Sequence, residues 1–139
     1  MKTLLSILTK GGGWRQSLYL RLVNPPHITL VIESLDESGP LGLPAISVAH
    51  YSQVSGELLR HPEMQFEIEL GAEGRSNLLP FYWRNDFVPE EQVSHYVDEL
   101  QYIVDAATYE RHIRFAELWD EVLGRQSFVE AFTDKCILG

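Results

Sequence analysis

Two periodicities of hydrophobic residues divide the chain into a helix, a series of strands and a second helix. Near the start, apolar residues recur at helical spacing over Thr3–Lys10, and Gly11 is a favourable residue for ending a helix. From residue 18 onward, apolar and polar positions alternate, as in strands that bury one face. The alternating segments cover residues 18–23, 28–33, 46–51, 66–70 and 79–84. Most connectors between them are too short for a crossover helix, so we expect antiparallel pairing.

Proline and glycine mark the turns between these segments. Asn24-Pro25-Pro26 ends one strand, residues 36–44 form a loop with two prolines and two glycines, and a turn is expected over Gly71–Gly74. Pro80 lies inside an alternating segment, where it has no backbone N–H to donate. We therefore expect its strand to lie at an edge of the sheet or to contain a bulge.

Residues 89–107 fit a helix and a strand equally well. One apolar series has helical spacing, and it consists of Val93, Val97, Leu100 and Val104. His95 and Val97, however, also continue an alternation that starts at Val93, as a strand would. Periodicity alone therefore leaves both structures open.

A second, amphipathic helix is predicted over residues 107–123, where apolar residues step by four, three, three and four positions. These residues are Tyr109, Ile113, Ala116, Trp119 and Leu123. Gly124 is expected to cap this helix, and Phe128–Phe132 to add a further turn.

Together these elements predict an α+β fold. It consists of an antiparallel meander of five to seven strands, covered by a short N-terminal helix and the longer amphipathic C-terminal helix. Both helices need a partner for their apolar faces, and the buried face of the sheet provides one. We expect a single domain over residues 1–139, with residues 129–139 as an added tail.

Charge changes the picture of the surface. The chain has 139 residues, 45% hydrophobic and 22% charged, and a net charge of −9. The C-terminal residues 86–139 hold 12 acids and 4 bases, whereas residues 1–85 hold 8 and 7. Such a surface repels nucleic-acid phosphates and attracts basic protein surfaces. We expect a protein partner with a basic surface and no direct contact with nucleic acid; a solvated helix face that aids solubility is the simpler alternative.

Other sequence features limit the compartment and the chemistry. The longest near-apolar run, Ile28–Ile32, is far too short to span a membrane. The apolar start at Leu4–Leu8 is followed by Lys10 and three glycines with no cleavage site, so we expect it to be part of the mature fold. One cysteine, Cys136, excludes an internal disulfide and a cysteine-rich zinc site. We therefore expect a cytoplasmic protein without membrane contact, metal or cofactor.

Two groups of residues are candidates for binding a partner. The first is the acidic side of the C-terminal helix, which carries Glu110, Glu117, Asp120 and Glu121. The second is the strand end with Tyr82, Arg84 and Asp86, where an aromatic–arginine pair resembles an interface anchor. Turn chemistry is the alternative for Arg84-Asn85-Asp86, with the Asn and Asp side chains bonding local backbone and Arg84 pairing with a carboxylate. We favour that alternative.

A pocket is the second possibility for function. His50 shares a strand face with Ile46 and Val48, which predicts an inward, hydrogen-bonded imidazole. His50, His95 and Asp86 could meet at one end of the sheet and form the pocket of a small enzyme or ligand-binding protein. No catalytic signature supports this, because both a helical His-Glu-x-x-His and a Gly-x-Ser-x-Gly motif are absent.

Several short motifs and two aromatic residues extend over most of the chain: Asn24-Pro25-Pro26, Val48-Ala49-His50-Tyr51, Gly56, Pro62-Glu63-Met64, Phe66-Glu67, Arg84-Asn85-Asp86, Phe115 and Trp119. In these the chain resembles a family of small uncharacterised proteins from bacteria, phages and mobile elements that share a domain of unknown function. The resemblance ends near Phe128 and implies that residues from Val129 onward are this protein's own. It also implies a strand after Arg84-Asn85-Asp86, which favours strands at Gln92–Val97 and Gln101–Val104.

These observations favour a small, non-catalytic, acidic interaction protein. Size, acidity and the family resemblance suggest an accessory or inhibitor protein of a mobile element, of the anti-restriction or anti-CRISPR type. Its carboxylates would occupy a basic groove that normally holds nucleic acid. The alternatives are the pocket around His50, His95 and Asp86, and a homodimer formed through an exposed strand edge.

Overall fold

The structure is a computed structural model that describes residues 1–71, 76–88 and 90–139. Most of the turn expected over Gly71–Gly74 lies outside this part. The helices and strands, in chain order, are α1 (Lys2–Lys10), β1 (Tyr19–Leu22), β2 (Leu30–Ser34), β3 (Ala45–Val54), β4 (Glu57–Leu70), β5 (Ser76–Asn85), β6 (Glu90–Val93), β7 (His95–Asp98), β8 (Gln101–Val104), α2 (Ala106–Arg125), α3 (Phe128–Ala131) and the 3₁₀ turn η2 (Asp134–Cys136).

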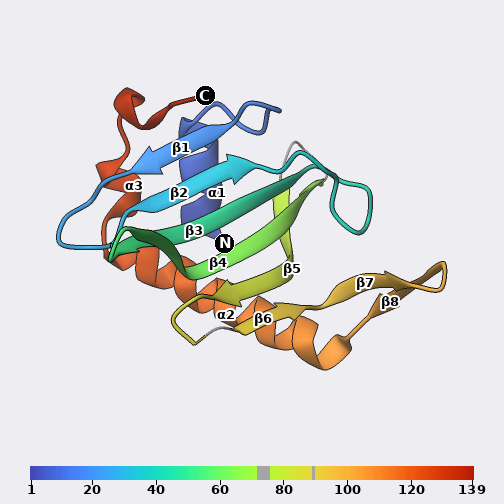
Figure 1. The fold of residues 1–139 in the computed structure, drawn as a ribbon. Helices are drawn as coiled ribbons and strands as arrows, with labels where there is room; N and C mark the ends of the chain where they lie inside the picture. The colour runs from blue at the N-terminus through green and yellow to red at the C-terminus, as the bar shows by residue number, and fades with distance from the viewer. Residues whose placement is uncertain (72–75, 89) are drawn as a thin grey trace.

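Strands β1 to β6 form one six-stranded antiparallel sheet in chain order, and β7 and β8 form a separate two-stranded hairpin. The helices lie on one side of the six-stranded sheet, and the hairpin projects away from it (Figure 1). This confirms the predicted α+β meander with a short N-terminal and a longer C-terminal helix. No helix in the described part of the chain is both long and apolar enough to cross a membrane.

The strand that contains Pro80 carries a bulge, one of the two arrangements expected for it. The register between β4 and β5 shifts between Gln65, which pairs with Tyr82, and Phe66, which pairs with Pro80. The extra residue, Phe81, faces no partner in this register. The other arrangement, an edge strand, does not occur, because β5 lies between β4 and β6.

Strands also form in the segment where periodicity left helix and strand open. Strands β6, β7 and β8 cover Glu90–Val104 apart from short breaks. The members of the helically spaced apolar series are all at least 40% exposed, so they do not form a stripe that a helix could bury. At the break, the Ser94 N–H donates to the Phe81 carbonyl (3.1 Å), and the Ser94 carbonyl accepts from the Asp105 N–H (2.7 Å). Ser94 therefore marks the point where the chain leaves the sheet.

Gly124 does not cap α2 as predicted. The helix continues to Arg125, and Gln126 is its C-cap. A Cβ atom at Gly124 would lie 2.8 Å from the hydroxyl oxygen of Thr3 in α1. The missing side chain thus allows close approach of the two helices and does not end the helix.

One hydrophobic core lies between the sheet and the three helices. Alternate residues of β1 to β5 enter it from the sheet, and residues of α1, α2 and α3 enter from the other side. Its fully buried members include Leu4, Ile7, Leu20, Leu22, Leu30, Ile32, Ile46, Met64, Phe66, Leu123 and Phe128. Complete burial stabilises the fold by roughly 1.5–3 kcal/mol for each such side chain. This burial holds the helices on the sheet.

The residues after α3 pack against β1. Cys136 is buried, Ile137 forms a β-bridge with Leu20, and the Leu138 N–H donates to the Tyr19 carbonyl (2.9 Å). This segment covers part of the outer edge of β1, which would otherwise present unpaired backbone groups.

The prediction that Asp120 belongs to an exposed acidic surface is wrong. Asp120 is 6% exposed, and its carboxylate accepts hydrogen bonds from the backbone N–H groups of Thr3 (3.1 Å) and Leu4 (2.8 Å). These N–H groups belong to the first turn of α1, where helical partners are lacking and the helix dipole favours a negative charge. Asp120 of α2 therefore caps α1.

Substituting Asp120→Ala is expected to lower the free energy of unfolding by about 1–2 kcal/mol, because it leaves the first turn of α1 without acceptors. Urea unfolding measures this change. The adjacent, exposed Glu121 provides the control, and Glu121→Ala should change stability by less than about 0.5 kcal/mol. Equal effects of the two substitutions would show that the cap does not stabilise the fold.

Candidate functional site

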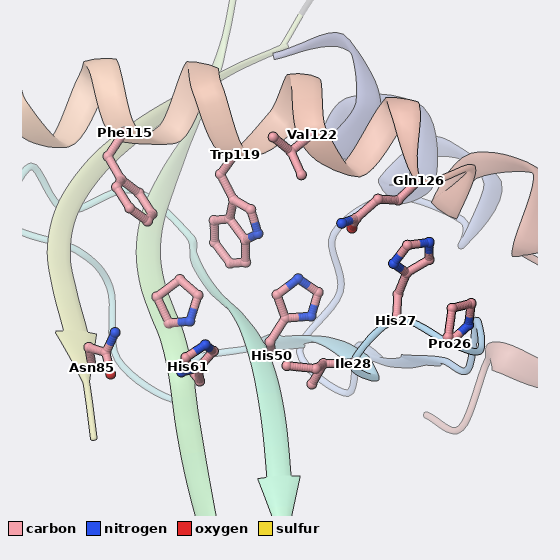
Figure 2. Close-up of a pocket in the computed structure, with 11 residues that line it drawn as sticks. Pro26, His27, Ile28, His50, His61, Asn85, Phe115, Trp119, Val122 and Gln126 are labelled. Carbon is pink, nitrogen blue, oxygen red and sulfur yellow. The ribbon is translucent and has the colours of Figure 1, made fainter. Parts of the chain in front are cut away.

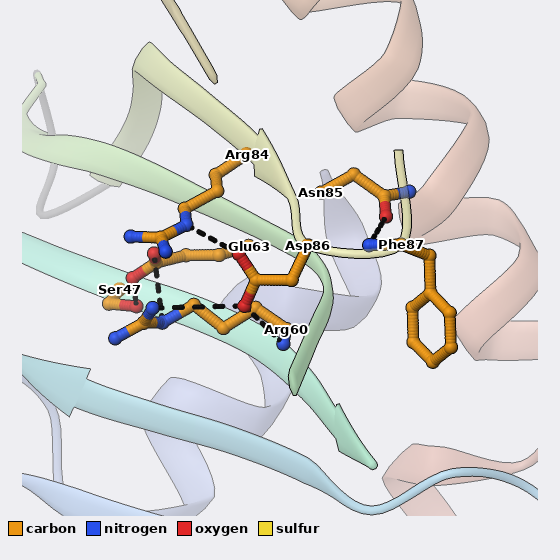
Figure 3. A network of polar contacts seen from close by, with 7 residues as sticks. All are labelled: Ser47, Arg60, Glu63, Arg84, Asn85, Asp86 and Phe87. Carbon is orange, nitrogen blue, oxygen red and sulfur yellow. Dashed lines mark hydrogen bonds and ion pairs between the residues drawn. The ribbon is translucent and has the colours of Figure 1, made fainter. Parts of the chain in front are cut away.

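Arg84-Asn85-Asp86 spans the end of β5 and the start of the turn that follows it, and its polar side chains bond to one another and to nearby backbone (Figure 3). Arg84 Nε donates to Asp86 Oδ1 (2.7 Å), and Asp86 Oδ2 accepts from the backbone N–H of Arg60 (2.8 Å). Asn85 Oδ1 accepts from the Phe87 N–H (2.9 Å). The Asn85 bond and the Arg84–Asp86 pair agree with the turn interpretation of the motif, whereas Asp86 bonds the backbone of β4 and not local backbone.

A network of charges continues from this turn across the sheet face that the helices do not cover. Arg60 Nε lies 3.4 Å from Glu63 Oε1, and the hydroxyl of Ser47 donates to Glu63 Oε2 (2.6 Å). Burial opposes ionisation of Asp86, but hydrogen bonds from the Arg60 backbone and the Arg84 side chain outweigh it and hold the pKa of Asp86 below its usual value. Opposite charges in this network thus compensate one another.

Tyr82 lies two residues before Arg84 on the same strand and is half-buried. Burial raises the pKa of its phenol, and the charge of nearby Glu91 acts in the same direction. The Asp86 side chain is only 13% exposed and faces Arg84, so little of its charge is available to a partner. Of the two charged members of the predicted recognition group, the Arg84 side chain is therefore the more accessible, at 37% exposed.

Three of the four acids predicted on α2 are exposed: Glu110, Glu117 and Glu121. Glu110 lies 3.7 Å from Arg114, one helical turn later, in a solvent-exposed pair. Because Asp120 is buried in the α1 cap, the acidic side of α2 is narrower than the sequence suggests.

The hairpin of β7 and β8, residues 95–104, is called the arm below. Its two tip residues, Glu99 and Leu100, have positive φ angles of 48° and 67°. Leu100 is 99% exposed. The arm therefore places an acidic and a large apolar side chain at the end of a projection from the molecule (Figure 1).

His95 anchors the arm to α2. Its ring packs edge-on against Tyr109 of α2, with 4.6 Å between ring centroids, and its Nδ1 lies 2.7 Å from the Ser94 hydroxyl oxygen. Burial lowers the pKa of His95. The predicted grouping of His50, His95 and Asp86 around one pocket is therefore not found, since β7 carries His95 off the sheet and Asp86 faces the two arginines.

His50 does line a pocket, together with residues that the sequence interpretation did not assign to it. The pocket has a volume of about 490 Å³ and lies between α2 and one end of the sheet (Figure 2). Its lining consists of Pro26, His27, Ile28, His50, His61, Pro62, Asn85, Phe115, Trp119, Val122 and Gln126. His27 follows the Asn24-Pro25-Pro26 motif, and His61 precedes Pro62-Glu63-Met64. The family resemblance rests partly on these two motifs, and they were the sequence signal that could have pointed to both histidines. Within residues 1–71, 76–88 and 90–139, no group of three or more His, Cys, Asp or Glu side chains is placed to hold a metal ion.

The pocket is held together by contacts between segments far apart in sequence. The Asn24 side-chain amide donates to the Gln126 carbonyl (2.7 Å), which ties the Pro25-Pro26 loop to the end of α2. His50 Nδ1 lies 3.4 Å from the Thr29 carbonyl, and its ring meets Trp119 edge-on at 5.5 Å. Burial lowers the pKa of His50, the neighbouring histidines add to this, and backbone hydrogen bonds offset part of it.

A further buried histidine, His112 of α2, lies outside this pocket. Its Nε2 is 3.3 Å from Oε1 of Gln92, and its Nδ1 has no hydrogen-bond partner among the described residues. Burial and the adjacent positive charge of Arg111 lower the pKa of His112 to about 4.

His112 is expected to make the protein less stable in mild acid. The unfolded chain binds a proton at this residue as pH falls through about 6.5, whereas the folded chain does so only near 4. The free energy of unfolding should therefore decrease across this window. Urea unfolding at a series of pH values should show a smaller decrease for His112→Leu than for the wild type, and equal decreases would contradict the assignment.

Comparisons with known proteins identify a family but no function. No curated protein and no solved structure matches the chain. One family model matches residues 2–129, which is most of the chain and ends within α3. The chain therefore belongs to the family described as a domain of unknown function, DUF6908.

Proposed function

We propose that the protein is a non-catalytic, acidic interaction protein that binds a partner with a basic surface through its arm. The arm is the observation that carries this proposal, since it projects from the sheet and exposes acidic and apolar side chains together (Figure 1). A hairpin that served only to connect β6 with α2 would need neither feature.

The charge of the arm and its surroundings has one sign. Residues 87–110 contain six acids and no Lys or Arg. All six are exposed, namely Glu90, Glu91, Asp98, Glu99, Asp105 and Glu110. Glu110 pairs with Arg114 and Glu91 lies opposite Arg84, whereas no ion pair among the described residues involves Asp98 or Glu99 of the arm. The field of these two carboxylates therefore extends into solvent and steers a basic partner toward the arm.

Apolar side chains on the arm supply what charge alone does not. Tyr96, Val97, Leu100, Tyr102 and Val104 are each more than 40% exposed. Binding energy at interfaces comes mainly from aromatic and apolar anchors that enter a recess of the partner, whereas surrounding charges set orientation and rate. A basic rim around an apolar recess is therefore the surface that fits the arm.

The tip of the arm supports the same reading. A two-residue hairpin turn with two positive φ angles is most favourable with Asn-Gly, whereas here it consists of Glu99 and Leu100. Side chains in the left-handed region cost stability. Residues that are unfavourable for the turn and almost fully exposed suggest that the tip is used in binding.

The accessory or inhibitor role in a mobile element is the specific form of this proposal. In that role the arm occupies a basic groove that otherwise holds nucleic acid, as an anti-restriction or anti-CRISPR protein does. The net charge of −9 and the unpaired acids of the arm support this role, because they could take the place of the negative phosphates of a nucleic acid.

A capture experiment with a matched pair of variants tests the proposal. The protein is immobilised on a resin and incubated with a lysate of the organism that encodes it. The arm variant carries Asp98→Asn, Glu99→Gln and Leu100→Ser. Because it removes two charges and one anchor, we expect about tenfold lower recovery of a basic partner, measured by quantitative mass spectrometry. Recovery by the wild type should also fall as salt screens the charges.

The control variant carries Glu130→Gln and Asp134→Asn, which remove two exposed acids outside the arm. It should recover the partner as the wild type does. Equal loss with both variants, or a partner whose recovery depends on neither salt nor the arm, would contradict the proposal.

A further inference from the structure

The pocket below α2 is separate from the arm and differs from it in character. Phe115, Trp119, Val122 and Gln126 face it from α2, and the histidines face it from the opposite side (Figure 2). Its volume of about 490 Å³ is in the range of pockets that hold small molecules. It lies at the far end of α2 from the arm, which adjoins Tyr109 near the start of that helix.

The lining favours an uncharged ligand. None of the described residues that line the pocket is Lys, Arg, Asp or Glu. Burial keeps His50 uncharged at neutral pH, because its pKa is below the usual 6.5. A phosphate or carboxylate would find no Lys or Arg there, and an ammonium group would find no carboxylate.

The pocket is lined by aromatic side chains and by side chains that can form hydrogen bonds. Trp119 and Phe115 offer aromatic surfaces, with ring centroids 6.2 Å apart. Asn85 uses its side-chain oxygen to hold the Phe87 N–H, which leaves its NH₂ group as a donor. The side-chain amide of Gln126 can both donate and accept.

The tautomer of His50 adds an acceptor. Its Nδ1 faces the Thr29 carbonyl, which only accepts hydrogen bonds, so the proton is on Nδ1. Nε2 is then unprotonated and able to accept a hydrogen bond from a ligand N–H. Aromatic faces together with donors and acceptors are the groups that recognise a planar nitrogen heterocycle.

We propose that this pocket binds an uncharged, planar, nitrogen-containing heteroaromatic molecule of the nucleobase class, presented as a free base or nucleoside. The ring stacks beside Trp119 and Phe115, and its edge bonds to Asn85, Gln126 and His50. A strand of nucleic acid is not the source, because the phosphates would approach a protein with a net charge of −9.

The test is a titration of the full chain with adenosine, guanosine, cytidine and uridine to millimolar concentration, followed by NMR of the imidazole Cε1–H groups. At least one nucleoside should give saturable shifts at His27, His50 and His61. The corresponding 5′-monophosphate and a homo-oligonucleotide should bind more weakly. Absence of shifts with all four nucleosides, or tighter binding of the monophosphate or oligonucleotide, would overturn the proposal.

Two variants locate the site. Ile28→Trp fills the pocket with an indole and should weaken binding by about tenfold or more, whereas Val23→Trp, at an exposed position outside the lining, should bind within about twofold of the wild type. If Ile28→Trp does not fold, Gln126→Ala serves instead. It keeps the backbone bond to Asn24, and it should weaken binding by about fivefold. Unchanged binding in a folded pocket variant would place the ligand elsewhere and refute the assignment.

Discussion

The structure depends on burial of one face of the six-stranded sheet beneath α1, α2 and α3. The sheet supplies alternate apolar residues, and without the helices these would face water. Asp120 strengthens this arrangement, because its carboxylate binds the first turn of α1 and so joins the two terminal segments of the chain. Gly124 permits the same two helices to approach closely. The pocket and the arm both follow from the way α2 crosses the sheet.

The pocket forms where α2 passes over the end of the sheet that carries His50 and His61, and the Pro25-Pro26 loop closes its side. The arm forms at the other end of the helix, where the chain leaves the sheet at Ser94 and returns at Asp105. On the uncovered sheet face, the charges of Arg60, Glu63, Arg84 and Asp86 compensate one another. Asp98 and Glu99 of the arm and Glu117 and Glu121 of α2 are exposed acids for which no ion pair is found among the described residues.

Alternation along the chain was sufficient to predict strands in β1 to β5, their antiparallel meander and the inward position of His50, because a strand's two faces are encoded locally. For β6 to β8 it was not sufficient, and only the family resemblance favoured strands there. Pro80 likewise predicted an edge strand or a bulge from its missing N–H, and the bulge is what occurs. Asp120 could not be assigned from its helix, since its partners lie 116 and 117 residues away in α1. The sequence predicted a pocket at His50, but its other members were assigned wrongly for the same reason. His27 and His61 have no shared local pattern, and only the fold brings them beside His50.

The central claim is that the arm binds the partner, whereas the sheet and the helices that cover it determine stability. Shortening the arm tests this claim most directly. Replacing Val97–Tyr102 with Asn-Gly keeps the pairing of Tyr96 with Ile103 and gives the hairpin a favourable turn. Urea unfolding first gives the stability of the shortened variant. Recovery of the basic partner by this variant is then compared with recovery by the wild type. The account predicts stability within about 0.5 kcal/mol of the wild type and loss of the partner. Undiminished recovery of the partner by the shortened, folded chain would contradict it.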